Sequence, residues 1–144
     1  MRGGLVAACF LIGAYAYAND DSLRLSSFQR SIDIESLWDS GNKSEARQLL
    51  EKWMRDEKSS PWPLVQSAAL QYRQKKYKSS LATLKKALEK SPQCAEAYYW
   101  RGKNFEAQNK PLDAANEYRA AVIAEQSYLE AQEALTRVLG LLGS

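Results

Sequence analysis

Apolar side chains recur at every third or fourth position along most of the chain. Leu81, Leu84 and Leu88 would lie on one face of a helix, and Leu50 and Trp53 would do the same in an earlier segment. This spacing is typical of amphipathic helices that bury one face. No stretch alternates apolar and polar residues long enough to predict a strand. The pattern therefore predicts an all-α protein.

Residues that stop or start helices divide this pattern at even intervals. Serine is a good N-cap, proline fits the first turn of a helix, and the residue before a proline avoids the helical conformation. Four breaks follow from these rules: Gly41-Asn42, Ser60-Pro61, Ser91-Pro92 and Asn109-Lys110-Pro111. Helices of roughly 12–16 residues joined by short turns are expected between them, which describes helical hairpins.

The sequence also matches itself when it is shifted by 34 residues. The shift superposes Ala46 on Ser80 and Ala114, Leu50 on Leu84 and Tyr118, Trp53 on Ala87 and Ala121, and Ile34 on Ala68 and Gly102. We interpret these as small residues where two helices touch and large ones where a hairpin closes. A fixed period of this length predicts a solenoid of helix–turn–helix units.

The third of these units carries the fullest pattern, with Tyr98, Gly102, Phe105, Ala114, Tyr118 and Ala121. The second keeps Leu64, Ala68, Ser80, Leu84, Ala87 and Pro92, and the first keeps Gly41, Ala46 and Leu50. On these residues the chain resembles the tetratricopeptide repeat family. The resemblance implies a right-handed α-solenoid of three hairpins followed by a C-terminal capping helix. Arg101, Ser67 and Asp33 depart from it, because the family usually has leucine there.

The pattern divides the chain into six segments. They are a signal peptide (1–18), a short segment leading into the repeats (19–26), repeats at 27–60, 61–94 and 95–128, and a capping helix (129–144). A capping helix is expected because the last hairpin leaves an apolar face that must be covered. Leu135, Val138, Leu139 and Leu142 are predicted to cover it, with Glu130, Glu133 and Arg137 facing water or the groove.

The first 18 residues have the parts of a secretory signal peptide: a basic start, an apolar middle and small residues before a polar turn. We expect cleavage after Ala18 and export to a bacterial periplasm, with no stable membrane span afterwards. A retained N-terminal anchor is an alternative. Another is a lipoprotein acylated at Cys9, because residues 6–9 resemble the box at which such proteins are cut.

Composition argues against catalysis. The chain has no histidine, which removes the commonest general base and the commonest metal ligand. Cys94 would be the one cysteine left after cleavage, and we interpret it as a small apolar filler between helices. We therefore expect no enzyme, no catalytic residues, no metal site and no cofactor.

The resemblance also implies a binding surface, since the first helix of each family hairpin lines the concave face of the superhelix. Carried onto this chain, the predicted groove comprises Phe28, Glu35, Trp38, Trp62, Val65, Tyr72, Tyr99, Lys103 and Glu106. Large aromatic side chains are common interface anchors, although Phe28 and Trp62 could equally pack against neighbouring hairpins. One known family groove holds a C-terminal carboxylate. Ser31, Glu35 and Gln66 stand at comparable places and cannot supply its positive clamp.

Charge is concentrated in the middle of the chain. Residues 64–90 contain seven Lys or Arg and only Glu89 against them, whereas residues 19–58 and 91–144 each carry a net −2. The predicted basic patch comprises Arg73, Lys75, Lys76, Lys78, Lys85 and Lys86. It could steer an anionic partner or simply be a solvated edge. The mature chain's net +2 is too small to indicate nucleic acid.

The leading hypothesis is a non-catalytic adaptor or scaffold of the cell envelope that binds another envelope protein, as a peptide or helix, in the concave groove. A second is a structural subunit that forms homo-oligomers through its terminal helices. A third is a binder of anionic envelope polymers that uses the basic patch.

Overall fold

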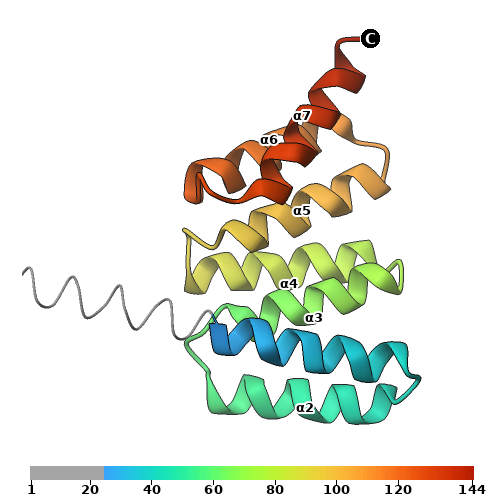
Figure 1. The fold of residues 1–144 in the computed structure, drawn as a ribbon, viewed down its shortest axis with the longest axis vertical. Coiled ribbons are helices and arrows are strands. Elements are labelled where there is room, and N and C mark those ends of the chain that lie inside the picture. The colour runs from blue at the N-terminus through green and yellow to red at the C-terminus, as the bar shows by residue number, and fades with distance from the viewer. Residues whose placement is uncertain (1–24) are drawn as a thin grey trace, which may run out of the picture. The chain divides into compact units, whose positions relative to one another are not determined.

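The computed structural model describes residues 25–144. The expected leader, Cys9 and most of the segment 19–26 lie outside the described residues. Within the described part the chain forms a helix over residues 25–39, followed by α2 (Lys43–Asp56), α3 (Trp62–Arg73), α4 (Tyr77–Lys90), α5 (Ala95–Ala107), α6 (Pro111–Ala124) and α7 (Leu129–Leu142) (Figure 1). These residues contain no strand, and none of their helices is long and apolar enough to cross a membrane. The predicted all-α fold of helical hairpins is confirmed.

The chain forms two compact units, the first ending at Leu49 and the second running from Leu50 to Ser144. In the first unit, the helix over residues 25–39 ends in a tight turn, where the Gly41 N–H donates to the Trp38 carbonyl at 3.2 Å. Gly41 has φ +88°, a conformation that glycine adopts without steric cost. The predicted turn role of Gly41 is confirmed.

In the second unit, α3 and α4 form one hairpin and α5 and α6 the next. The helix α5 contacts both helices of the preceding hairpin as well as α6, and α7 packs on α6 (Figure 1). The α3–α4 hairpin ends where the sequence predicts, because Ser91 is extended at φ −143° and ψ 97° immediately before Pro92. At its start, Ser60 accepts a hydrogen bond from the Trp62 N–H at 3.3 Å. The N-cap position itself falls one residue later, at Pro61.

The 34-residue register is confirmed by burial. All twelve positions that the shift superposes are buried: Ile34, Ala46, Leu50, Trp53, Ala68, Ser80, Leu84, Ala87, Gly102, Ala114, Tyr118 and Ala121. The backbone repeats with the same period, since Gly41, Lys75 and Asn109 all have positive φ, at +88°, +60° and +57°. Each of the three lies in the turn between the two helices of its hairpin.

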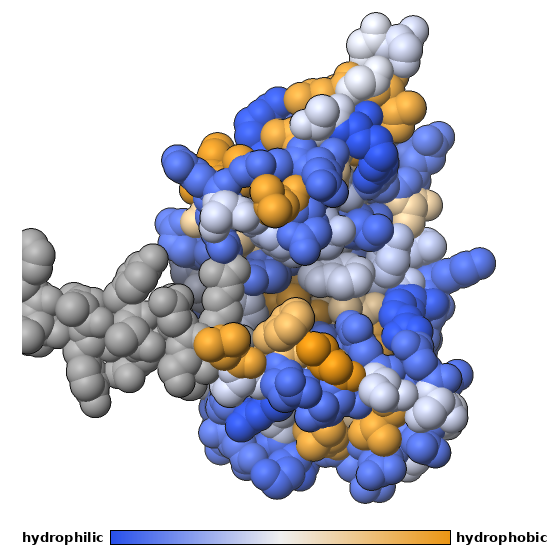
Figure 2. Space-filling view, viewed as in Figure 1, coloured by the Kyte–Doolittle hydropathy of each residue, from blue (hydrophilic) through white to orange (hydrophobic). Residues whose placement is uncertain are grey.

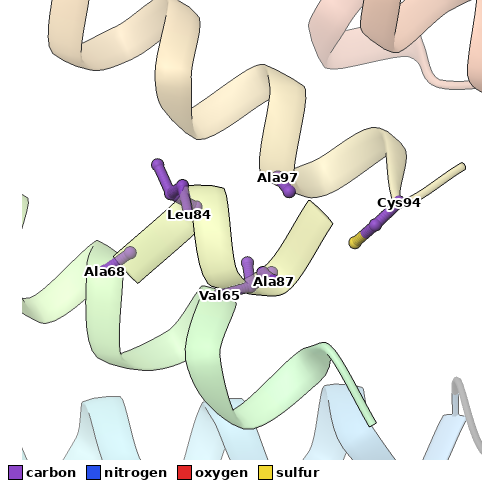
Figure 3. Close-up of a cluster of buried hydrophobic side chains, with 6 residues drawn as sticks. All are labelled: Val65, Ala68, Leu84, Ala87, Cys94 and Ala97. Atoms are coloured by element: carbon purple, nitrogen blue, oxygen red, sulfur yellow. The ribbon is translucent and has the colours of Figure 1, made fainter. Parts of the chain in front are cut away.

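Two apolar clusters hold the second unit together. The first joins α3, α4 and the start of α5, and consists of Val65, Ala68, Leu84, Ala87, Cys94 and Ala97 (Figure 3). Cys94 is 3% exposed in this cluster, which fits its interpretation as an apolar filler. The second cluster joins α6 and α7 and consists of Ala114, Ala115, Tyr118, Ala134 and Val138.

A buried polar chain ties three helices to one another. Asn104 on α5 donates through Nδ2 to Ser80 Oγ on α4 at 2.9 Å, and Ser80 Oγ donates to the Ala68 carbonyl on α3 at 2.8 Å. Asn104 and Ser80 are fully buried. Because a buried polar group is costly without a partner, this chain favours one arrangement of α3, α4 and α5 over alternatives.

The predicted apolar face of the capping helix needs one correction. Val138 is fully buried and Leu135 packs against the α6–α7 cluster, as expected. Leu139 and Leu142, however, are 43% and 38% exposed. Ala131 and Ala134 are buried instead, because small side chains let α7 approach α6 closely.

Candidate functional site

A continuous row of aromatic rings crosses the second unit. Tyr72 at the end of α3 contacts Tyr77 with ring centroids 5.8 Å apart and Trp100 on α5 at 5.6 Å. Tyr99 contacts Trp100 at 5.9 Å and Tyr128, just before α7, at 5.3 Å. Tilted and edge-on rings at these separations attract one another. We call these five residues, Tyr72, Tyr77, Tyr99, Trp100 and Tyr128, the aromatic strip.

The aromatic strip is only half covered. All five side chains are intermediate between buried and exposed. The hydroxyls of Tyr72, Tyr99 and Tyr128 make no hydrogen bond to any of the residues 25–144, so each can pair with an incoming group. Burial raises the pKa of each of these tyrosines above the ordinary value of 10.0. A phenol is already protonated at neutral pH at that ordinary value, so each hydroxyl can donate.

A lysine lies beside the strip. Lys103 Nζ lies 5.8 Å from the centre of the Tyr72 ring, within the range of a cation–π contact. Lys103 lies one turn after Tyr99 on α5, so both side chains come from the same side of that helix. The strip therefore combines apolar rings with a positive charge, which suits a partner that has both apolar and acidic side chains.

Glu106, one turn beyond Lys103, is held by two helices. Arg137 on α7 donates to it through Nη1 at 2.6 Å and Nη2 at 2.9 Å, and the Tyr118 hydroxyl on α6 also donates to it. The Arg137 hydrogen bond is the main reason that the pKa of Glu106 lies below its usual range, with the Tyr118 hydrogen bond adding to it against the opposing effect of burial. Glu106 thus links α5, α6 and α7.

The ring of Tyr118 reaches Glu106 because Gly102 leaves room for it. A Cβ at Gly102 would lie 2.5 Å from Tyr118 Cε1 and 2.6 Å from Cδ1. Burial raises the pKa of Tyr118, followed by its hydrogen bond to the Glu106 carboxylate. The pairing of a small residue with a large one, read from the sequence, is a direct contact in the structure.

The structure brings four of the predicted groove residues together: Tyr72, Tyr99, Lys103 and Glu106. Two others pack in or against the interior. Val65 is 7% exposed and lies in the α3–α4–α5 cluster, so it offers no open face to a partner. Trp62 packs against that cluster and is only partly buried, as Trp100 of the aromatic strip is.

The predicted groove residues of the first unit are placed differently. Phe28 is 66% exposed and Glu35 is half-buried. Trp38 is only 8% exposed, and Lys43 Nζ and the Arg47 guanidinium lie over its ring at 5.4 Å and 5.7 Å. We therefore remove Trp38 from the candidate surface, since its ring is already covered by its own chain.

Four residues of the site were missed or misassigned from the sequence. Tyr77, Trp100 and Tyr128 were not predicted to belong to it, although Tyr128 ends the third predicted repeat and precedes α7. Arg137 was expected to face water or the groove, but not to bind Glu106. A signal for Arg137 was present, because one more 34-residue shift places it on Lys103.

The predicted basic patch is solvent-exposed throughout. It comprises Arg73 at the end of α3, Lys75 and Lys76 in the α3–α4 turn, and Lys78, Lys85 and Lys86 on α4. Among the residues described here, no group of three or more His, Cys, Asp or Glu side chains could hold a metal ion. The aromatic strip and the basic patch can therefore recognise a partner through aromatic rings, hydroxyl groups and positive charge.

Fold and repeat period define this molecule as an α-helical repeat protein built from helix–turn–helix hairpins. Residues 65–128 match the family model described as "Tetratricopeptide repeat". No curated protein sequence matches the chain.

Solved structures of tetratricopeptide repeat domains are similar to this chain. The first such domain of Spaghetti (RPAP3), bound to the HSP90 peptide SRMEEVD, is 21% identical with a TM-score of 0.65, covering 82% of this chain and 94% of that one. The first domain of human RPAP3 is 20% identical with a TM-score of 0.66, covering 81% and 92%. The Arabidopsis OM64 domain is 17% identical with a TM-score of 0.64, covering 79% and 94%. At these identities the similarity shows the fold.

Proposed function

We propose that this protein is a non-catalytic adaptor that binds a peptide or helix of a partner protein on the aromatic strip. The observation that carries the proposal is the half-covered row of rings with three unpaired phenol hydroxyls and the Lys103 ammonium beside it. Tyrosine and tryptophan anchor interfaces well, because they bury a large area with little loss of rotamer freedom. The similar Spaghetti domain in complex with a peptide supports this use of the fold.

The test is capture of partners with the full chain as bait, followed by binding measurements on the purified partner. The double variant Tyr72→Ala/Tyr99→Ala should lose binding at least about tenfold, because each ring is a candidate anchor. Tyr98→Phe is the matched control. Tyr98 neighbours Tyr99 on α5, but its hydroxyl donates to the Pro92 carbonyl, away from the strip. A folded double variant that binds as well as the parent chain would refute the proposal.

The partner segment is not expected to be a C-terminal carboxylate of the chaperone type. A clamp for such a tail needs positive or amide side chains at the places of Ser31, Glu35 and Gln66. Glu35 has the wrong charge, and Gln66 is 5% exposed. We instead propose a partner segment that places apolar side chains on the rings and an acidic one near Lys103.

We further propose that the partner belongs to a bacterial cell envelope and that the protein is exported. The support is the sequence of residues 1–18. Cell fractionation and N-terminal sequencing of the native protein provide the test. A mature N-terminus at Asn19 in the periplasmic fraction is expected. Retention of Met1 in a cytoplasmic fraction would contradict this part of the proposal.

A second candidate function is self-association through the ends of the chain. Large apolar side chains are exposed at both ends of the described residues, with Leu25 at 70%, Phe28 at 66%, Leu129 at 65% and Leu141 at 64%. Apolar residues appear in orange over α7 near the C-terminus (Figure 2). Light scattering across a range of concentrations should show growth in mass that Leu141→Glu abolishes. A parent chain that stays monomeric throughout would rule this candidate out.

A further inference from the structure

The α3–α4 turn and the outer face of α4 carry five lysines without a carboxylate partner. Lys75, Lys76, Lys78, Lys85 and Lys86 are all exposed, and none forms an ion pair with the residues the structure describes. With Arg73, which is also exposed, they make up the basic surface. Hydrophilic side chains cover this edge of the molecule in Figure 2, where the turn lies in Figure 1. Elsewhere in the chain a lysine does pair with a carboxylate, since Lys52 Nζ lies 2.8 Å from Asp56 Oδ2.

These lysines also act against the helix that bears them. The N-terminus of α4 is its positive end, where acidic side chains stabilise a helix and basic ones destabilise it. The first turns of α2, α5, α6 and α7 each contain an acidic residue, whereas those of α3 and α4 contain none. Instead Lys76 occupies the N-cap position without a capping hydrogen bond, and Lys78 follows in the first turn. An anionic group bound here would offset the repulsion between these lysines and the positive end of α4. It would also accept hydrogen bonds from the uncapped backbone amides of the first turn.

The basic surface is short, and its extent indicates what it can bind. Lys78 and Lys85 are seven residues apart on α4, so they lie on one side of the helix about 10.5 Å apart. An extended chain of about four to six residues spans the turn and these two helical turns. The excess of positive charge is confined to this part of the sequence, since residues 91–144 carry a net −2. A short acidic segment matches this limited extent better than a long uniform polyanion.

We propose that the basic surface docks a short acidic segment of a partner protein, separately from the aromatic strip. Two or more carboxylates of the segment pair with the lysines of the turn and of α4. The two surfaces adjoin at Tyr77, which lies between Lys76 and Lys78 in sequence and contacts Tyr72 of the strip. Binding here depends on charge and is weakened by salt, because the lysines are exposed.

The test uses the full chain and a fluorescent ten-residue peptide in which half the residues are glutamate. The double variant Lys76→Glu/Lys78→Glu should weaken peptide binding at least about tenfold, since it reverses two charges on the surface. The same variant should raise the melting temperature, because it places acidic residues at the positive end of α4. Weaker binding together with higher stability distinguishes a docking role from a structural one.

Lys110→Glu is the matched control. Lys110 lies 34 residues after Lys76, is exposed, and is the N-cap of α6 as Lys76 is of α4. It should leave peptide binding within about twofold of the parent, because it lies outside the basic surface. Undiminished binding of the peptide by the double variant would overturn the proposal. So would tighter binding by the parent chain of single-stranded DNA of equal charge, or of anionic phospholipid vesicles.

Discussion

At Gly102 a single methyl group would have no room. Its Cβ would fall within 2.8 Å of three atoms of the Tyr118 ring, which the buried α6 cluster holds in place. Alanine is ordinarily the better helix former, so the sequence alone would rate the substitution as favourable. Packing makes the substitution unfavourable instead, because the Tyr118 ring cannot shift without breaking its hydrogen bond to Glu106.

We predict that Gly102→Ala destabilises the protein by about 1–3 kcal/mol, the usual cost of overpacking. Gly140→Ala is the control, because Gly140 lies in α7 with nothing within 4 Å of its Cβ. It should stabilise the protein by about 0.5–1 kcal/mol through helix propensity. Urea denaturation of both variants checks the prediction, and equal effects of the two substitutions would contradict it.

Lys75 occupies a backbone conformation that suits glycine better. Its φ of +60° is left-handed, and such residues with a Cβ bear a steric cost of roughly 1–2 kcal/mol. We predict that Lys75→Gly raises stability by up to about 1 kcal/mol, less than the full cost because glycine is more flexible when unfolded. Asn109→Gly should gain less at the equivalent turn, because asparagine tolerates this conformation. Thermal unfolding of the two variants gives the comparison.

Helices α5, α6 and α7 are joined by Glu106, since one carboxylate accepts hydrogen bonds from Tyr118 on α6 and Arg137 on α7. The paired Arg137 side chain is 52% exposed, so solvent screens part of this interaction. Hydrogen bonds between charged groups still exceed neutral ones in strength. This contact fixes the position of α7 relative to the aromatic strip.

We predict that Glu106→Gln costs about 1–2 kcal/mol at neutral pH. The pKa of Glu106 is lowered in the folded state, so its stabilisation is present above the ordinary glutamate pKa of about 4.3 and is lost as pH falls through the lower folded pKa. The stability difference between the parent and Glu106→Gln should therefore shrink below about pH 4.3. Denaturation at a series of pH values measures it.

Glu117→Gln is a control for which the opposite pH dependence of stability is expected. Burial raises the pKa of Glu117, an effect that the Arg101 charge 3.0 Å away only partly offsets. Protonation of Glu117 then favours the folded state, so the stability of the parent relative to Glu117→Gln should grow as pH falls. If both variants changed in the same direction, the assignment of Glu106 would be wrong.

The elements were predictable from the sequence because they depend on spacing. The 34-residue shift identifies the buried positions of every hairpin, since the two helices of each repeat pack against each other through equivalent positions. The site was predictable only in part. Tyr72, Tyr99 and Lys103 follow from their places on the inner helices, but the covering of Trp38 by Lys43 and Arg47 depends on rotamers that no spacing reveals. The Arg137–Glu106 pair joins residues 31 positions apart, outside the repeat period.

In the second unit as a whole, stability should be greatest in the middle. Each repeat of such an array contacts only the repeats beside it, so a helix packed on both sides opens less often than one at an end. The helix α5 contacts α3, α4 and α6, whereas α7 packs on α6 and ends in exposed leucines.

We predict that hydrogen exchange is slowest in α5 and α6 and fastest in the last turn of α7. Exchange monitored by mass spectrometry on the full chain provides the measurement. Arg137→Ala should speed exchange in α7 with little effect on α3, because it releases only the link to α5. Uniform acceleration along residues 50–144 would show that the unit opens as one piece instead.

Trp100 has a practical consequence for how this protein can be studied. Its indole lies edge-on to both Tyr72 and Tyr99, at 5.6 Å and 5.9 Å, in the middle of the aromatic strip. Any ligand seated on those rings would change the polarity around the indole and with it the emission spectrum. The protein therefore carries its own optical reporter, and a chain in which the other three tryptophans are replaced by phenylalanine would signal occupancy without a label.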